Sequence, residues 1–377
     1  MIDVEKHRKL FPIIQEKIQL SSCSQSAMHK QVKESINQYL NSWEESGMEW
    51  SSWMNKCESA RRKFADMINA EEEEIAIVSS VSHAVSSIAA SLPKKKGKKR
   101  VLITESDFPT VGQIWLAQKD YKVFFIDPNE NHEIELEQYE EEITDDTLIT
   151  SVSHVSYYNG FRQNVKKISE IAHKKDSYIF VDAYQSSGQI PIDVKKDDVD
   201  FLATGLQKYM LGIPGIAFLY IKKEISEQLT PKVTGWFGQK NPFDFDIKGT
   251  NYAPKTKRFD SGTYPMINSF AADAALDILL EVGVHNIESY LKELSKYAIE
   301  YSLESGLILK SPLDSEKKGS TLAIHAHNAS EIEGLMKQKG IIVSARNDVV
   351  RIAPHFYNNK EDIASAIEEI AKVIVAT

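Results

Sequence analysis

The sequence predicts an α/β protein of two domains, a large one on a mainly parallel seven-stranded sheet and a smaller α+β domain at the C-terminal end. From about residue 75, short apolar runs alternate with amphipathic stretches, as in a parallel sheet covered by helices on both faces. After Met266, long amphipathic stretches come first and strands follow, which is typical of an α+β unit. The 377 residues suffice for both, since a domain holds roughly 100–200 residues.

Seven segments are the predicted strands of the large sheet, because each is apolar, too short for a helix and rich in β-branched or aromatic residues. They span residues 74–78, 101–104, 123–126, 148–155, 178–182, 201–204 and 216–221. Between the fourth and the fifth, residues 165–174 carry apolar side chains at helical spacing and predict a crossover helix. A further helix is expected at 85–92.

The C-terminal part has its own predicted elements. Helices are expected at 269–282, 286–304 and 361–375, and strands at 321–325, 341–344 and 349–352. An N-terminal helix is expected at 28–43. We therefore predict an N-terminal segment, residues 1–45, that packs with the small domain, a large domain of residues 46–265, and a small domain of residues 266–377.

Composition excludes several classes of protein. The net charge of -9 argues against binding to a nucleic-acid backbone, and no stretch approaches the roughly 18 consecutive apolar residues of a membrane span. Two cysteines, Cys23 and Cys57, cannot form a disulfide framework or a four-thiolate metal site. We expect a cytoplasmic protein without a metal site.

Two charged residues are predicted to meet at one edge of the large sheet. Asp182 ends one strand and Lys208 follows the next, and ligands of open α/β sheets lie at the carboxyl ends of the strands. Taken singly, Asp182 could be a helix cap and Lys208 a solvated surface group. Together with Gln185 they match what pyridoxal phosphate needs: a carboxylate at the pyridine nitrogen, a lysine for the Schiff base, and a donor to the phenolate oxygen.

The same residues carry a resemblance. Val181-Asp182-Ala183-Tyr184-Gln185-Ser186-Ser187-Gly188 with Gly205-Leu206-Gln207-Lys208 resembles the signature of the class V aminotransferase family, which includes cysteine desulfurases, kynureninases and isopenicillin N epimerases. The resemblance covers roughly residues 60–360 and implies pyridoxal phosphate as cofactor, with the fold type I of pyridoxal-phosphate-dependent transferases.

Other segments match the family in the same order. Phe108-Pro109 resembles the position whose ring stacks on the pyridine, and Ser153-His154-Val155 the segment near the phenolate oxygen. The segment 258–263 resembles the one whose Gly262 and Thr263 reach the phosphate of the neighbouring subunit's cofactor, which implies a homodimer with shared sites. Arg351 resembles the arginine that binds the α-carboxylate of an amino-acid substrate, and a guanidinium fork matches a carboxylate well.

The cofactor's phosphate is expected at segment 79–84, which includes Ser82 and His83 and lies between a strand and a helix. A simple helix cap would use the same serines. Gln207 stands where many family members carry histidine, and Gly205 where desulfurases often carry serine. We expect Thr204 or Gln207 to compensate for these departures.

The reaction is harder to predict than the cofactor. Family desulfurases use a loop cysteine shortly before the arginine, but residues 343–350 contain none, and both cysteines lie near the N-terminus. We therefore expect transamination, with a lyase or epimerase as the alternative. The segment around Trp236 resembles the epimerase and kynureninase-like members, and Trp236 could stack on a substrate or simply belong to the core or a dimer interface.

Two alternative functions lie outside amino-acid catalysis. A protein that binds the cofactor without turnover would not need Arg351 beside Lys208 and Asp182. A nucleotide-binding Rossmann protein would need a Gly-x-Gly-x-x-Gly turn after an early strand, and the sequence has no such turn.

Overall fold

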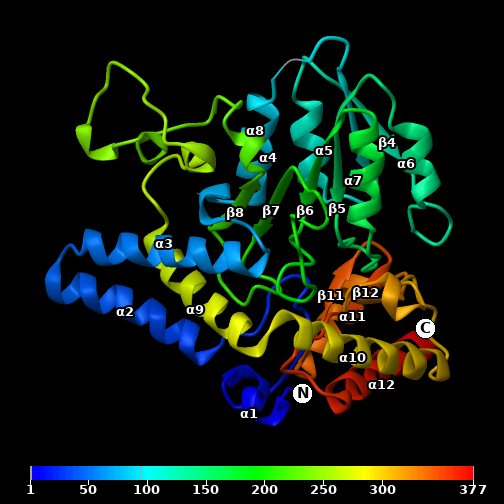
Figure 1. Ribbon diagram of the computed structural model, residues 1–377. Coiled ribbons are helices and arrows are strands. Elements are labelled where there is room, and N and C mark those ends of the chain that lie inside the picture. The colour runs from blue at the N-terminus through cyan, green and yellow to red at the C-terminus, as the bar shows by residue number, and fades with distance from the viewer. Residues whose placement is uncertain (1, 94, 377) are drawn as a thin grey trace.

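The structure is a computed structural model that describes residues 2–93 and 95–376 (Figure 1). Its large sheet has seven strands in the order β2-β8-β7-β6-β5-β3-β4. The strands are β2 (Ile75–Val78), β3 (Arg100–Thr104), β4 (Lys122–Ile126), β5 (Thr147–Ser153), β6 (Tyr178–Asp182), β7 (Phe201–Gly205) and β8 (Ala217–Ile221). β8 is antiparallel to both of its neighbours, and the other pairs are parallel. The predicted α/β fold with a mainly parallel sheet is confirmed.

Helices cover both faces of this sheet because successive strand residues point to opposite sides. On one face, Ile75 and Ile77 of β2 pack in the same core as residues of α3 (Trp50–Met67), α7 (Val165–Lys174) and α9 (Met266–Val282). On the other, Ala76 and Val78 pack with residues of α4 (Val81–Ser91) and α5 (Pro109–Leu116). Two shorter helices, α6 (Leu136–Glu142) and α8 (Lys223–Ser226), lie beside the sheet. A strand buried on both faces explains the continuous apolar runs in the sequence.

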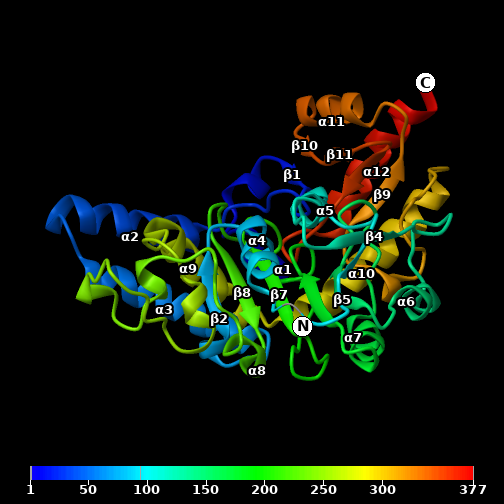
Figure 2. The same cartoon turned by 90° about the horizontal axis from the view of Figure 1, so that it is seen from above.

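The C-terminal elements gather apart from the large sheet (Figure 2). Strands β11 (Ser344–Arg346), β12 (Val349–Ile352) and β9 (Leu322–His325) form an antiparallel sheet with β12 in the middle. Helices α10 (Val284–Glu304), α11 (Ala329–Gln338) and α12 (Lys360–Ala376) accompany it. The prediction of one strand at 341–344 is wrong, because β10 (Ile341–Ile342) pairs with β1 (Ile18–Gln19) while β11 pairs with β12. Helix α11 had not been predicted.

The N-terminal segment contacts the C-terminal elements. Arg8, at the end of α1 (Val4–Arg8), forms an ion pair of 2.6 Å with Asp362 of α12, and β1 pairs with β10. Leu20 and Ala353 share a backbone hydrogen bond of 2.7 Å. Helix α2 (Lys30–Ser46) then packs against α9 (Figure 1). The assignment of residues 1–45 to the small domain and the domain boundaries stay a prediction.

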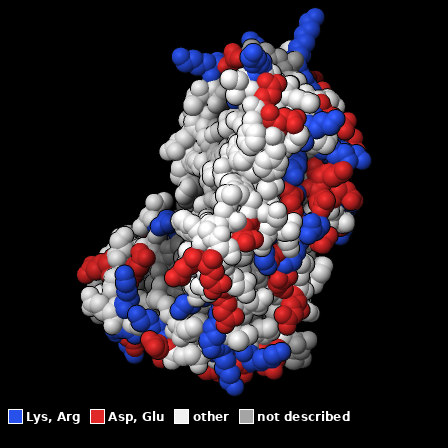
Figure 3. All heavy atoms as spheres, turned by 90° about the vertical axis from the view of Figure 1, so that its left-hand side faces the viewer, with Lys and Arg blue, Asp and Glu red and all other residues white. Residues whose placement is uncertain are grey.

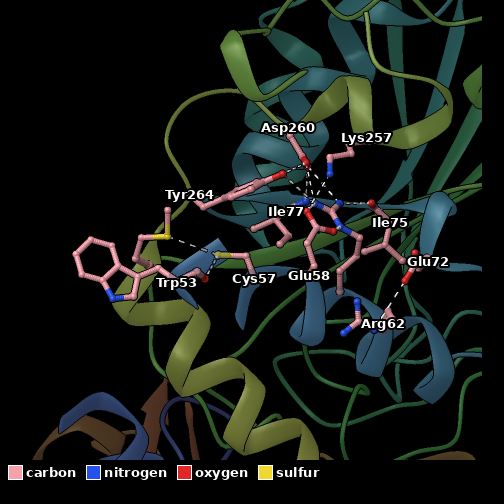
Figure 4. A network of polar contacts seen from close by, with 12 residues as sticks. Trp53, Cys57, Glu58, Arg62, Glu72, Ile75, Ile77, Lys257, Asp260 and Tyr264 are labelled. Carbon is pink, nitrogen blue, oxygen red and sulfur yellow. Dashed lines mark hydrogen bonds and ion pairs between the residues drawn. The ribbon is translucent and has the colours of Figure 1, made fainter. Parts of the chain in front are cut away.

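A buried polar network fixes the segment that leads into α9 (Figure 4). Arg61 of α3 donates to Asp260 at 2.8 Å and to the Ile75 carbonyl at 2.5 Å. Asp260 also accepts from the Ile77 N–H at 2.8 Å and from the Tyr264 hydroxyl at 2.5 Å. The network therefore ties residues 260–264 to α3 and β2. Within the described residues, no helix has the length and apolarity needed to cross a membrane.

Candidate active site

A cavity of about 340 Å³ lies at the carboxyl ends of β5, β6 and β7. The register aligns Ser153 with Asp182 and Asp182 with Ala203, so these ends meet at one edge of the sheet. The cavity is lined by Cys23, Ser24, Ser80, Val81, Ser82, Phe108, Thr110, Ser153, Val155, Tyr157, Asp182, Tyr184, Gln185, Gln207, Lys208, Arg346 and Arg351. Ligands of open α/β sheets occupy this position.

Lys208 brings an amine into this cavity from the turn after β7. Its Nζ lies 4.3 Å from the ring centre of Tyr184 and 5.7 Å from that of Phe108. Burial lowers the pKa of Lys208 to about 8, although the negative charge of Asp182 acts in the opposite direction. An amine with this pKa is partly neutral near physiological pH, and only the neutral form is a nucleophile.

Asp182 is a buried carboxylate on the same cavity. Burial raises the pKa of Asp182, while the backbone N–H of Tyr184, at 2.9 Å, and the charge of Lys208 favour the ionised form. Because a buried carboxylate is costly without a cationic partner, Asp182 suits a ligand with a protonated ring nitrogen.

The side-chain amide of Gln185 makes a hydrogen bond through its nitrogen but none through its oxygen among the described residues. Its Nε2 donates to the Cys23 carbonyl at 3.0 Å, whereas Oε1 is buried without a hydrogen-bond partner among the described residues. Nε2 carries two hydrogens, so a second donor remains for a ligand oxygen. An unsatisfied buried polar atom on a cavity is a group that a bound ligand or water satisfies.

Arg351 is a buried cation without an anionic partner. Its side chain is 1% exposed, and its NH1 donates to the Tyr157 carbonyl at 2.5 Å. Its NH2 donates to the hydroxyls of Ser24, at 3.2 Å, and Ser344, at 2.7 Å. These partners are neutral, and no carboxylate forms an ion pair with Arg351 in the part of the chain that the structure describes. Burying an unpaired charge is costly, so this position favours an anionic ligand such as a carboxylate.

The start of α4 offers a place for a phosphate. The hydroxyls of Ser82 and Thr110 lie 2.7 Å apart, at the beginnings of α4 and α5, and both residues line the cavity. The Ser80 hydroxyl already accepts from the His83 N–H at 3.0 Å and caps the helix. Free backbone N–H groups at a helix start, with the helix dipole, favour an anion. Thr110 had not been predicted from the sequence.

Seven predicted site residues line the cavity: Ser82, Phe108, Asp182, Gln185, Gln207, Lys208 and Arg351. His83, Thr204 and His154 do not. The His83 ring contacts the Ser79 hydroxyl at 3.2 Å. Thr204 is buried in β7 and donates to the backbone carbonyl of Gly205 at 3.2 Å. His154 faces a neighbouring hollow, because alternation along the chain directs Ser153 and Val155 to the cavity and His154 away from it.

The other three predicted residues lie at the surface of this chain. Gly262 and Thr263 are exposed. Trp236 lies in a projecting loop and lines a separate hollow with Phe245 and Ile247. The cavity of one chain therefore does not include them, and their predicted roles depend on a second subunit or on a substrate larger than the cavity.

Cys23 is a cavity residue that the sequence pattern does not reveal. It lies near the N-terminus of the sequence and outside the loop where family desulfurases carry their cysteine, yet it lines the cavity beside Lys208 and Arg351. The backbone pairing of β1 with β10 and of Leu20 with Ala353 brings it there. That pairing joins residues more than 300 positions apart in the sequence, and no local sequence pattern predicts it.

Gly205 departs from the desulfurase pattern for a steric reason. A Cβ added at Gly205 would collide with the ring of Tyr184, the same ring that lies over Lys208. The aromatic side chain therefore occupies the space that a serine would need, which explains the missing hydroxyl at this position.

The residues present fit pyridoxal phosphate. The cavity offers the Lys208 amine with its lowered pKa, the buried Asp182 carboxylate, the Gln185 amide with a hydrogen still free to donate, and hydroxyls at the start of α4 and α5. The family model described as "Aminotransferase class-V" matches residues 19–365. The chain belongs to the class V aminotransferase family. It is accordingly a pyridoxal-phosphate-dependent enzyme of fold type I. Among the described residues, no cluster of His, Cys, Asp or Glu could hold a metal ion.

Known proteins of the family resemble this chain along almost its whole length. An "uncharacterized aminotransferase YcbU" of Bacillus subtilis (strain 168) is 46% identical over 367 residues, which cover 97% of each protein. A kynureninase of Bacillus thuringiensis is 26% identical, over 95% of this chain and 88% of that protein. An apo structure of a cysteine desulfurase from Thermococcus onnurineus NA1 superposes with a TM-score of 0.90 at 22% identity, over 100% of this chain and 99% of the other, and supports the fold.

Proposed function

We propose that the protein transforms an amino acid with pyridoxal phosphate bound at Lys208, and that the reaction is a transamination. One observation carries the proposal: the amine of Lys208 and the unpaired buried guanidinium of Arg351 line the same cavity. An amine that can hold a carbonyl cofactor thus lies beside a cation that can hold a carboxylate. The similarity to an aminotransferase over 97% of both chains supports the choice of reaction.

The cavity residues divide the proposed reaction among them. Pyridoxal phosphate, when bound, withdraws electrons from the substrate and makes its Cα proton acidic. The amine of Lys208 would hold the cofactor before the substrate binds, and would then act as general base and acid toward the substrate's Cα proton. Asp182 would keep a proton on the ring nitrogen, and Gln185 would donate to the phenolate oxygen. Ser82, Thr110 and Gln207 would hold the phosphate, and Phe108 would pack against the ring.

We further propose a homodimer, as the resemblance implies. Gly262 and Thr263 are exposed in one chain and have no cavity of their own. The neighbouring loop carries Phe243, Phe245 and Ile247, which are 51%, 72% and 94% exposed. On the side on which this loop projects, an area at the upper left is largely uncharged, while charged side chains gather along the top and right edges (Figure 3). A large exposed apolar area favours a protein interface.

The two cysteines are free thiols, which supports the expected reducing, cytoplasmic compartment.

Cleavage of a carbon–sulfur bond is the second candidate, and Cys23 favours it. Cys23 lines the cavity together with Lys208, so a thiol is available close to a bound substrate. If a thiol of this chain accepted sulfur from cysteine, Cys23→Ala would abolish sulfide release in the presence of a thiol reductant. Transamination would survive the same substitution, because no step of it uses Cys23.

The experiment is the visible absorption spectrum of the purified protein with pyridoxal phosphate, before and after a panel of amino acids. We expect a visible band that Lys208→Ala lacks and that the exposed-lysine control Lys248→Ala retains. Loss of the band with equimolar release of a keto acid supports transamination. Release of ammonia, sulfide or an epimer without the keto acid would instead support the lyase or epimerase alternative. A protein that stays colourless would refute the proposal.

A further inference from the structure

A second arginine, Arg346, lines the cavity beside Arg351. Arg346 is exposed, and its NH1 donates to the adjacent Ala345 carbonyl at 2.9 Å. No carboxylate of the described chain forms an ion pair with it. The guanidinium therefore keeps most of its donors for water or for a ligand.

The register of the β11–β12 hairpin places both arginines on one face. Ser344 lies opposite Arg351, and Arg346 lies opposite Val349. Side chains two residues apart in a strand share a face, as do directly opposed pairs. The hydrogen bond of 2.7 Å from Arg351 to the Ser344 hydroxyl confirms that this pair shares a side. Arg346 is thus the next side chain on the Arg351 face, roughly 7 Å farther along the strand toward solvent.

The nearest acid along the chain is already engaged. Asp348 accepts from the Tyr158 hydroxyl at 2.7 Å and lies 3.2 Å from His325 Nδ1. The cavity lining holds three cations, Lys208, Arg346 and Arg351, against a single carboxylate, Asp182. The proposed function uses Asp182 and Lys208 at the cofactor and Arg351 at the α-carboxylate. Arg346 remains as a cation without an assigned anion.

We infer that Arg346 selects substrates with a second acidic group, so that the amino acids this enzyme prefers carry a side-chain carboxylate. This inference rests on the proposed function, because it takes Arg351 as the site of the α-carboxylate. A planar guanidinium binds a carboxylate through two parallel hydrogen bonds. At a solvent-exposed position such as that of Arg346, such a contact should change affinity by about five-fold, and less at high salt.

The test compares acids with their uncharged amides, which have nearly the same shape. Dissociation constants for L-aspartate and L-asparagine, and for L-glutamate and L-glutamine, are measured from the spectrum of the cofactor-loaded protein. We expect the acid of at least one pair to bind about five-fold more tightly, and Arg346→Gln to remove that preference while leaving amide binding unchanged. Arg62→Gln, another exposed arginine outside the cavity, should keep the preference.

A second measurement avoids the reaction altogether. Succinate has two carboxylates and butyrate one, and neither carries an amine, so calorimetry reports binding alone. The wild-type protein should prefer succinate and Arg346→Gln should not. Equal binding of acids and amides by the wild type, or a preference that survives in Arg346→Gln, would overturn the inference. If no amino acid alters the spectrum at all, the proposed function fails first, and this inference fails with it.

Discussion

Replacing Arg61 with methionine tests how the segment that leads into α9, residues 260–264, is held. Arg61 is 3% exposed and its partner Asp260 is fully buried. In Arg61→Met, the Asp260 carboxylate keeps the Ile77 N–H and the Tyr264 hydroxyl (Figure 4) but loses the one cation that pairs with it among the described residues. Removing one partner of a buried ion pair costs about 3–5 kcal/mol, because the other charge stays buried. The Ile75 carbonyl also loses its 2.5 Å donor.

The next residue in the sequence supplies a matched control. Arg62 and Glu72 also form an ion pair, but at 3.9 Å and with side chains that are 56% and 51% exposed. An exposed pair of this kind contributes about 0–1 kcal/mol. Arg62→Met removes the same charge from the same helix, so the difference between the two variants measures what the buried contacts of Arg61 contribute.

The assay is urea unfolding of the wild type and both variants at one pH, with the free energy of unfolding taken from the midpoint and slope. We expect Arg61→Met to lose about 3–5 kcal/mol and Arg62→Met at most about 1 kcal/mol. The double variant Arg61→Met with Asp260→Asn should recover part of the loss, because no charge then stays buried at position 260 and the amide oxygen can still accept from the Ile77 N–H. Two single variants of equal stability would refute this reasoning.

Two further predictions concern pH. Uptake of pyridoxal phosphate by the cofactor-free protein should accelerate as pH rises through about 8, because burial lowers the pKa of Lys208 to about 8. In Asp182→Asn the pH midpoint of this acceleration should fall, because the negative charge of Asp182 raises the pKa of Lys208. An unchanged pH midpoint would contradict this effect of Asp182. The hydrogen bond to Asp200, 2.9 Å long, raises the pKa of His173 above 6.5, so this pair should stabilise the fold fully below about pH 6.5 and lose its effect as pH rises through the raised value. His173→Gln should therefore lower the thermal midpoint at about pH 5 and not at about pH 9, and a loss of the same size at both would contradict the assignment.

Local sequence carried enough information for the large sheet and the two charged residues at its edge. The strands are short apolar runs that fill a sheet buried on both faces, and this pattern needs no distant partner to be visible. Asp182 and Lys208 follow two strands that are neighbours in both sequence and space. Their convergence therefore follows from the parallel arrangement alone.

Residues that depend on distant pairing could not be predicted. Cys23 reaches the cavity only because β1 joins β10. Arg346 shares a face with Arg351 only in the observed hairpin register, and a shift of one residue would turn its side chain away. His154 lies in the expected segment, yet one position out of phase with the residues that line the cavity. A motif locates a segment, but the backbone geometry decides which of its side chains faces a ligand.

The central claim is that Lys208 carries the cofactor. Borohydride reduction of the protein with bound pyridoxal phosphate fixes the cofactor to the amine that holds it, and peptide mapping by mass spectrometry then identifies the labelled lysine. We predict a single modified peptide with the label on Lys208, in a protein that has lost its activity. A label on another lysine, or no label on a protein that retains its visible band, would contradict the account.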